Sequence, residues 1–155
     1  MKVNVSILTV SDTRSLADDF SGQLIFELLT KKNFNPSRHI IVKDDCAAIT
    51  HGVGSLVANS DAIILNGGTG IAKRDVTFEA ITPLLVQEIP GFGELFRYLS
   101  FKEIGSHALA SRALAGFTQD DTLLFCLPGS TKACQLGMEK LILPELVHLL
   151  KERRK

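Results

Sequence analysis

The stretch Ala62-Ile63-Ile64-Leu65-Asn66-Gly67-Gly68-Thr69-Gly70 joins an apolar run to a glycine-rich turn, and Arg74-Asp75-Val76-Thr77 follows it closely. A short apolar run that ends at a turn is typical of a buried strand. Glycines allow positive φ and a close approach of the backbone to a ligand, so successive N–H groups can converge on an anion. Arg74 and Asp75 could then meet phosphate oxygens and a divalent metal ion. The pattern indicates a phosphate-handling enzyme, although a tight structural turn would use the same glycines.

Similar apolar runs recur on both sides of this stretch. We expect strands over 3–10, 39–42, 62–65 and 122–127, and helices around 24–29, 49–57, 77–86, 92–113 and 131–151, the last interrupted near Pro144. Strands that are apolar throughout and alternate with helices are typical of a parallel sheet covered on both faces. The sequence therefore predicts one α/β domain over residues 1–155.

Four of the predicted strands end in polar or glycine-containing loops, at 11–14, 43–45, 67–70 and 128–130. In a parallel sheet these ends lie on the same edge, where open α/β sheets bind ligands. We therefore expect a composite site there. Its hydroxyl groups could bond phosphate or ribose, or simply close turns: Ser11, Thr13 and Ser130.

Two consecutive carboxylates, Asp44 and Asp45, follow the second strand. One of them suits the N-cap position of the next helix. The other could face the edge of the sheet, opposite Asp75. Two carboxylates beside a triphosphate suit Mg²⁺, a hard cation that prefers oxygen ligands.

Several other signatures are missing. The glycine stretch lacks the G-x-x-x-x-G-K-[ST] spacing of a P-loop, and Gly91-Phe92-Gly93 lacks the third glycine of a dinucleotide fingerprint. The sequence has no G-x-S-x-G elbow, and its histidines and cysteines lack the spacing of zinc ligands. Four polar residues fall in stretches predicted to be helical, where a solvated position is the simplest interpretation: Glu94, Arg97, Ser111 and Arg112.

Composition narrows the class of protein. Lys+Arg and Asp+Glu number 17 each over 155 residues, so no overall positive field favours nucleic acid or an anionic membrane. Three cysteines without a disulfide pattern favour a reducing compartment. The sequence has neither a signal-peptide layout nor a membrane-length apolar run. We expect a cytoplasmic protein.

Taken in order, the motifs resemble the molybdopterin adenylyltransferases of molybdenum-cofactor biosynthesis, the MoaB and Mog group, and are closer to the MoaB branch. The resemblance covers nearly the whole chain. It rests on residues 9–14, Asp19 with Ser21-Gly22, Asp44-Asp45, 67–70 with 74–77, 90–97, 111–113 and 127–133.

This resemblance implies a three-layer α/β/α sandwich with a mostly parallel, mixed central sheet, the Rossmann-like molybdopterin-binding fold. It also implies transfer of AMP from Mg-ATP to the terminal phosphate of molybdopterin, with release of pyrophosphate. Mg²⁺ would be the cofactor, and the assembly a homotrimer or homohexamer. The product would pass to a molybdate-insertion enzyme.

The resemblance also assigns residues by position. Asp44 and Asp75 correspond to the essential acidic residues, with Mg²⁺ as their metal. The nucleotide- and phosphate-binding loops would be Gly67, Gly68, Thr69 and Gly70 with Pro128, Gly129 and Ser130. The molybdopterin side would include Ser11, Asp12, Arg74, Glu94, Arg97, Ser111 and Arg112.

Two alternatives of other classes stand beside the enzyme. One is a carrier that holds molybdopterin without chemistry. The other is a related domain that acts in molybdate insertion or in nucleotide-pyrophosphate hydrolysis. The presence of both Asp44 and Asp75 favours the adenylyltransferase.

Overall fold

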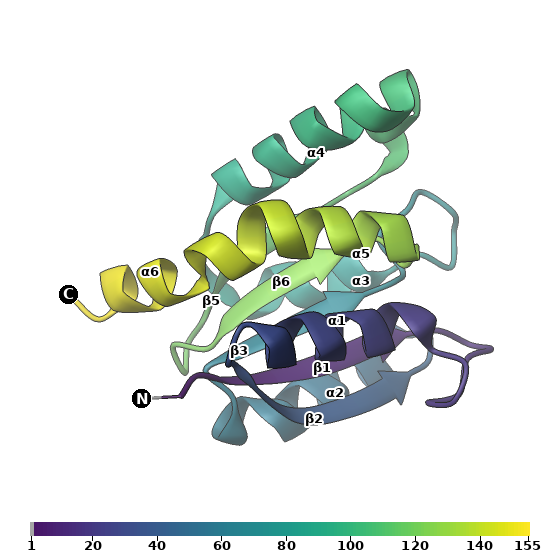
Figure 1. Ribbon diagram of the computed structural model, residues 1–155. Coiled ribbons are helices and arrows are strands. Elements are labelled where there is room, and N and C mark those ends of the chain that lie inside the picture. The colour runs from purple at the N-terminus through teal and green to yellow at the C-terminus, as the bar shows by residue number, and fades with distance from the viewer. Residues whose placement is uncertain (1) are drawn as a thin grey trace.

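A six-stranded sheet with the strand order β2-β1-β3-β6-β5-β4 runs through the centre of the computed structural model, which describes residues 2–155 (Figure 1). The strands are β1 (Asn4–Val10), β2 (Asn35–Val42), β3 (Ala62–Asn66), β4 (Leu85–Glu88), β5 (Leu114–Thr118) and β6 (Leu123–Leu127). The α-helices are α1 (Phe20–Lys31), α2 (Cys46–Leu56), α3 (Thr77–Ile81), α4 (Pro90–Ile104), α5 (Thr131–Gly137) and α6 (Leu143–Arg153). Short 3-10 turns follow α2, α3 and α4 at Val57–Asn59, Thr82–Leu84 and Gly105–Ala110.

Four of the strands are parallel. β1 pairs in parallel with both β2 and β3, and β3 pairs in parallel with β6. β5 is antiparallel to β6, and β4 is antiparallel to β5. The α/β class and the mixed sheet are thus confirmed. The loops after β1, β2, β3 and β6 all lie at one edge of the sheet.

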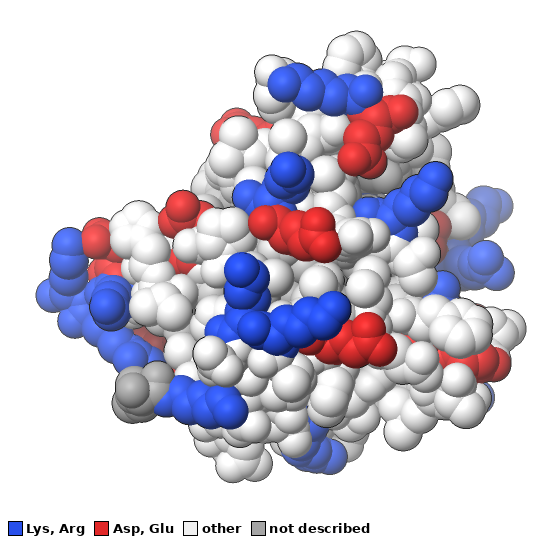
Figure 2. Space-filling view, viewed as in Figure 1, with Lys and Arg blue, Asp and Glu red and all other residues white. Residues whose placement is uncertain are grey.

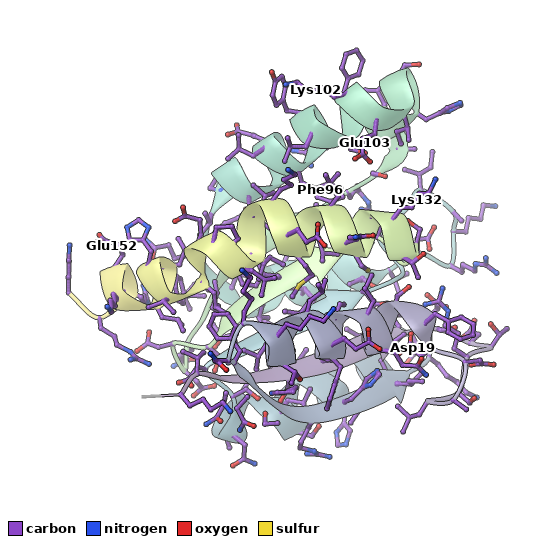
Figure 3. All side chains as sticks on the ribbon, in the orientation of Figure 1. Asp19, Phe96, Lys102, Glu103, Lys132 and Glu152 are labelled. Carbon is purple, nitrogen blue, oxygen red and sulfur yellow. The ribbon has the colours of Figure 1, made fainter. Side chains whose placement is uncertain are left out.

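Helices cover both faces, because side chains alternate along each strand. Ile64 of β3 packs in one core with residues of α1, α4, α5 and α6. Ile63, its neighbour, packs in the other core with residues of α2 and α3. Figure 1 shows α1, α5 and α6 in front of the sheet and α2 and α3 behind it. Phe96, fully buried, lies on the side of α4 that faces the other elements (Figure 3).

Side-chain caps fix the first turn of three helices. Asp19 accepts from the Gly22 N–H at the start of α1, and Asp45 accepts from the Ala48 N–H at the start of α2. Ser130 does the same for the Ala133 N–H at the start of α5. Each cap satisfies an N–H that has no partner within its helix. The chain is thereby held where it passes from the edge of the sheet into a helix.

Two predicted helices are partly wrong. Helical structure from Thr77 ends at Leu84, and β4 begins at Leu85, inside the predicted helix over 77–86. The predicted helix over 92–113 stops at Ile104; a 3-10 segment follows to Ala110, and β5 begins at Leu114. β5 is stabilised by pairing with β6 and β4, and β4 by pairing with β5 alone; such pairing has no local sequence signal. β2 also begins earlier than predicted, at Asn35.

The predicted interruption near Pro144 is confirmed. A π-helical segment, Met138–Ile142, separates α5 from α6. Proline lacks an N–H and therefore cannot complete the regular pattern of helical hydrogen bonds. The helical path nevertheless continues across the sheet (Figure 1).

Charge is distributed evenly over the surface in view. Figure 2 shows basic and acidic side chains interspersed on this face rather than gathered by sign, in agreement with the balanced composition. Within residues 2–155, no helix is both long and apolar enough to cross a bilayer.

Candidate active site

A cleft of about 410 Å³ lies where the loops after the four parallel strands meet. It is lined by Val10, Ser11, Asp12, Thr13, Arg14, Asp44, Gly67, Gly68, Thr69, Gly70, Arg74, Asp75, Ser111, Pro128 and Gly129. Most of the site residues predicted from the sequence therefore share one cavity, as the composite-site prediction requires.

The turn after β3 needs glycine for structural reasons. Gly67 and Gly68 have φ values of 98° and 68°, which side chains disfavour. A Cβ on Gly67 would collide with the carbonyl oxygen of Val10 at the end of β1. The Gly67 N–H donates to the Leu127 carbonyl at 3.0 Å, so the turn is joined to the end of β6 as well. The structural turn and the phosphate cradle, alternatives in the sequence, are compatible here.

The next N–H groups of this turn remain available. Within residues 2–155, no oxygen accepts a hydrogen bond from the N–H of Gly68, Thr69 or Gly70. All three residues line the cleft. Consecutive unpaired N–H groups in a turn with positive φ form a concavity that suits anions.

Acidic side chains form another part of the wall. The Asp44 N–H donates to Oδ1 of Asp12 at 3.0 Å, which joins the loop after β2 to the loop after β1. Partial burial raises the pKa of the Asp44 carboxyl above its usual value, and the negative charges of Asp12 and Asp75 raise it further. Arg74 opposes this shift. A cation between these carboxylates would relieve their repulsion.

The two aspartates after β2 have separate roles. Asp45 caps α2, with 2.9 Å between its Oδ2 and the Ala48 nitrogen. Asp44 lines the cleft, as does Asp75. The prediction that one of the pair caps the helix while the other faces the sheet edge is confirmed.

The donor set suits a metal ion that arrives with a phosphate ligand. In the described part of the chain, no three His, Cys, Asp or Glu side chains form a preformed metal cluster. Mg²⁺ usually keeps several waters and binds through one or two carboxylates together with substrate phosphates. Asp75 already accepts from the Ala72 N–H through Oδ2, at 2.9 Å. Asp44 and the remaining oxygen of Asp75 fit such a site.

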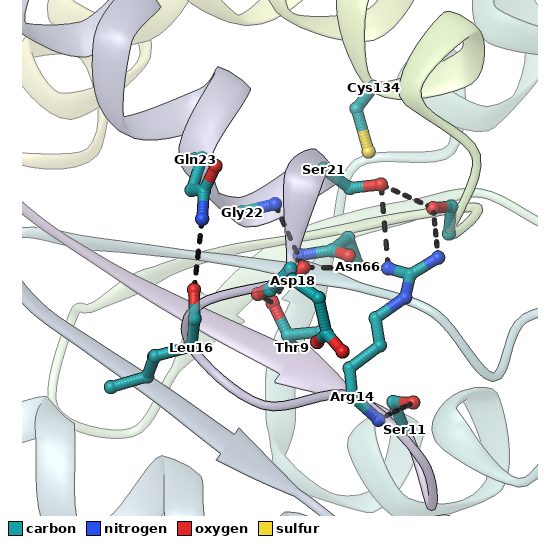
Figure 4. A network of polar contacts seen from close by, with 12 residues as sticks. Thr9, Ser11, Arg14, Leu16, Asp18, Ser21, Gly22, Gln23, Asn66 and Cys134 are labelled. Atoms are coloured by element: carbon teal, nitrogen blue, oxygen red, sulfur yellow. Dashed lines mark hydrogen bonds and ion pairs between the residues drawn. The ribbon is translucent and has the colours of Figure 1, made fainter.

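Arg14 lines the cleft, although the sequence had not assigned it a site role. Its Nη2 donates to the Gly129 carbonyl at 3.2 Å, and Nη1 donates to Oγ of Ser21 at 3.4 Å (Figure 4). Nη1 also lies 3.5 Å from Oδ1 of Asp19. The arginine thus links the loops after β1 and β6 to the start of α1. Its place in the loop 11–14, after a predicted strand and within a motif that carries the family resemblance, was the available signal.

The other predicted site residues lie outside this cleft. Ser130 caps α5. Glu94 and Arg97 line a separate cavity of about 150 Å³ beside α4 and the start of β5. Arg112 lies in neither cavity and not in a helix; it donates to backbone carbonyls of the glycine turn.

Comparison with known proteins gives a consistent result. Residues 6–148 match the protein family described as "Probable molybdopterin binding domain". "Molybdenum cofactor biosynthesis protein B" of Staphylococcus epidermidis is 53% identical over an alignment of 159 residues, gaps included, which covers 99% of this chain and 90% of the relative. The protein of the same name from Bacillus subtilis is 50% identical over an alignment of 156 residues, which covers 99% of this chain and 91% of the relative.

Solved structures agree. A crystal structure of molybdenum cofactor biosynthesis protein B superposes with a TM-score of 0.95 at 46% identity and covers 100% of this chain and 98% of that one. The tungsten cofactor synthesizing protein MoaB from Pyrococcus furiosus gives a TM-score of 0.91 at 35% identity, with 99% and 98% covered.

Proposed function

The chain belongs to the molybdenum-cofactor biosynthesis family of molybdopterin-binding domains, and we propose that it is a molybdopterin adenylyltransferase. It transfers AMP from Mg-ATP to the terminal phosphate of molybdopterin and releases pyrophosphate. The observation that carries this proposal is one cleft in which Asp44 and Asp75 accompany a glycine turn with unpaired N–H groups. A carrier without chemistry needs no carboxylates beside a phosphate cradle.

The reaction asks little covalent chemistry of the protein. An oxygen of the molybdopterin phosphate attacks the α-phosphorus of ATP, and the bond to the bridging oxygen of pyrophosphate breaks with its electron pair. The attacking phosphate is already ionised at neutral pH, so no strong general base is required. None of the residues that line the cleft in the described chain is a histidine, which fits this mechanism. Positioning and charge neutralisation then provide most of the acceleration.

The cleft residues divide the work accordingly. The N–H groups of Gly68, Thr69 and Gly70 hold triphosphate oxygens, and Arg74 adds a positive charge. Asp44 and Asp75 would hold Mg²⁺, which neutralises charge on the phosphates when it is bound. Ser11, Asp12 and Ser111, also in the cleft, form the molybdopterin side.

We also propose a homotrimer or homohexamer. The outer face of α4 exposes four large apolar or aromatic side chains: Leu95, Tyr98, Phe101 and Ile104. Contiguous apolar surface of this kind is typical of protein contacts. Light scattering coupled to size-exclusion chromatography would measure the assembly; a monomer would contradict this part of the proposal. The adenylated product is an activated intermediate, and we propose that a molybdate-insertion enzyme consumes it.

Pyrophosphate release tests the function directly. Purified protein is incubated with Mg-ATP, with and without molybdopterin, and compared with Asp75→Asn. Asparagine keeps an oxygen that can accept from the Ala72 N–H, so the local turn is preserved. An amide is a much poorer Mg²⁺ ligand than a carboxylate, and we expect release to fall by a factor of about 1,000. Asp121→Asn, in the turn at the opposite end of β6, is the matched control.

The outcomes separate the two classes of function. Release that depends on molybdopterin and is lost only in Asp75→Asn supports the enzyme. Molybdopterin binding without any release would instead favour the carrier. Normal release by Asp75→Asn would remove this residue from the mechanism.

A further inference from the structure

Arg112 donates hydrogen bonds to the glycine turn and to α3. Its Nε donates to the Thr69 carbonyl at 3.1 Å, and its Nη2 donates to the carbonyls of Gly70 at 3.0 Å and Asp75 at 3.3 Å. Nη1 donates to the Glu79 carboxylate at 2.6 Å. The side chain comes from the segment just before β5, more than forty residues from the turn that it holds. Every nitrogen of the guanidinium donates to a protein acceptor, and only one N–H, on Nη1, is left over.

Thr77 binds the two carbonyls of the glycine turn that precede those held by Arg112. Its Oγ1 donates to the Gly67 carbonyl at 2.8 Å, and its backbone N–H donates to the Gly68 carbonyl at 3.0 Å. Thr77 is fully buried at the start of α3. Four consecutive carbonyls, from Gly67 to Gly70, are therefore held by two residues.

Fixing a carbonyl also fixes the next N–H. The atoms of a trans peptide lie in one plane, with the C=O of one residue antiparallel to the N–H of the next. Because the carbonyls of residues 67–69 are directed at Thr77 and Arg112, the N–H groups of Gly68, Thr69 and Gly70 are directed the other way. Those N–H groups have no partner among residues 2–155, and their residues line the cleft.

We propose that Arg112 is a positioning residue, which orients the peptide planes of the glycine turn so that their N–H groups bind the triphosphate. It acts through the Thr69 and Gly70 carbonyls rather than on the molybdopterin phosphate, the role that the resemblance assigned to it. Thr77 has the same function for the first two peptides. This inference rests on the proposed function for its substrate and extends it to residues outside the cleft.

Charge and orientation can be separated by substitution. Arg112→Lys keeps the positive charge but replaces a planar fork by a compact ammonium that cannot reach the same set of carbonyls. We expect kcat to fall by roughly 100-fold, because small misplacements in a site have effects of that size. KM for molybdopterin should change far less, since Arg112 does not touch it. Arg153→Lys is the matched control. Arg112 pairs with Glu79 and stacks on Phe78; Arg153 pairs with Asp121 and stacks on Phe117, away from the cleft.

Thr77 gives an independent test with no change of charge. Thr77→Val removes the hydroxyl that holds the Gly67 carbonyl and keeps the shape, whereas Thr77→Ser keeps the hydroxyl. We expect the valine variant to lose activity in the same manner as Arg112→Lys, and the serine variant to recover most of it. Circular dichroism melting identifies any variant that fails to fold. If Arg112→Lys does not fold, the comparison of the two Thr77 variants still shows whether activity depends on hydrogen bonds to the carbonyls of the glycine turn.

A binding measurement keeps this inference apart from the proposed function. Titration calorimetry with inorganic tripolyphosphate and Mg²⁺ requires neither molybdopterin nor turnover. We expect Arg112→Lys and Thr77→Val to bind at least about tenfold more weakly than the wild type and Arg153→Lys, which corresponds to about 1.4 kcal/mol. Wild-type affinity and kcat in both variants would overturn the positioning role. Weak binding by the variants, beside a wild type that binds but releases no pyrophosphate, would support it and contradict only the adenylyltransferase.

Discussion

Nε2 of His39 in β2 lies 2.8 Å from Oδ2 of Asp19, a carboxylate whose side chain is completely buried at the start of α1. Thr9 of β1 donates to the same oxygen at 2.5 Å, and the Gly22 N–H donates to the other oxygen. Burial raises the pKa of Asp19, but the hydrogen bonds from His39, Thr9 and Gly22 outweigh it, and the net pKa lies below its usual value. The Asp19 carboxylate thus joins β1 and β2 to the first turn of α1.

Asp19→Asn should destabilise the fold by about 2–3 kcal/mol, because an amide cannot accept from all these donors. A carboxyl whose folded pKa is depressed stabilises the protein fully above its unfolded pKa of about 4, and this contribution is lost as the pH falls from that value through the lower folded pKa. The difference between wild type and variant should therefore be full at pH 7 and shrink below about pH 4. Urea unfolding across this range measures it.

The neighbouring residue provides the control for that experiment. Asp18 is exposed, and Asp18→Asn should change the free energy of unfolding by less than about 0.5 kcal/mol. A difference between Asp19→Asn and wild type that stays constant down to pH 3 would show that Asp19 contributes through shape and not through its charge.

Two glycine-to-alanine substitutions should have opposite effects. At Gly67 the φ of 98° and the nearby Val10 carbonyl leave no room for a methyl group, so Gly67→Ala should destabilise by about 1–3 kcal/mol and abolish phosphate binding. Gly54 lies within α2 with open space around its missing Cβ, so Gly54→Ala should stabilise by about 0.5–1 kcal/mol. Thermal melting of both variants checks this. A Gly67→Ala protein as stable as wild type would mean that the glycine turn can move away from the Val10 carbonyl at no cost in stability.

Thiol reactivity should separate one cysteine from the other two. Cys46 is exposed, whereas Cys126 and Cys134 are buried. Burial raises the pKa of both buried thiols to about 12, so almost no reactive thiolate exists at neutral pH. Iodoacetamide at pH 8 should modify one thiol of the native protein, as counted by mass spectrometry, and none in Cys46→Ser. Modification of all three should require denaturant; rapid labelling of three native thiols would contradict the packing of β6 and α5.

The parallel half of the sheet could be predicted because its strands carry their own signal. β3 and β6 are apolar at nearly every position and end at glycine-containing turns. β4 differs: three of its four residues are exposed, and its pairing with β5 is what defines it. β5 contains alanine and glycine in its centre, and Gly116 packs against the Gln87 carbonyl. Neither strand can be recognised without its partner.

The site residues likewise divide into those with a local sequence signal and those defined by partners far along the chain. Residues that follow a predicted strand, such as Asp44 and Ser11, could be placed at the edge by topology alone. Arg112 and His39 could not, because their partners lie far along the chain: Thr69 for the first and Asp19 for the second. A stretch predicted to be helical led to a solvent-exposed assignment for Arg112, whereas the segment before β5 turns it toward the glycine loop.

The adjacent aspartates after β2 should respond oppositely to substitution. Asp44 is held near Asp12 and Asp75, and its raised pKa means that its ionised form is disfavoured in the folded protein. Such a group lowers stability at pH values above its folded pKa and has no effect below its unfolded pKa. Asp44→Asn should therefore raise the melting temperature by about 1–2 °C at pH 7, show no gain near pH 3, and abolish turnover. Asp45→Ala removes the cap of α2 and should instead lower stability by about 1 kcal/mol, or roughly 2–4 °C, while turnover persists below the new melting point. Differential scanning fluorimetry beside the pyrophosphate assay measures both effects. If Asp44→Asn is less stable than wild type at pH 7, the acidic wall of the cleft is not repulsive, and the argument for a cation there loses its main physical support.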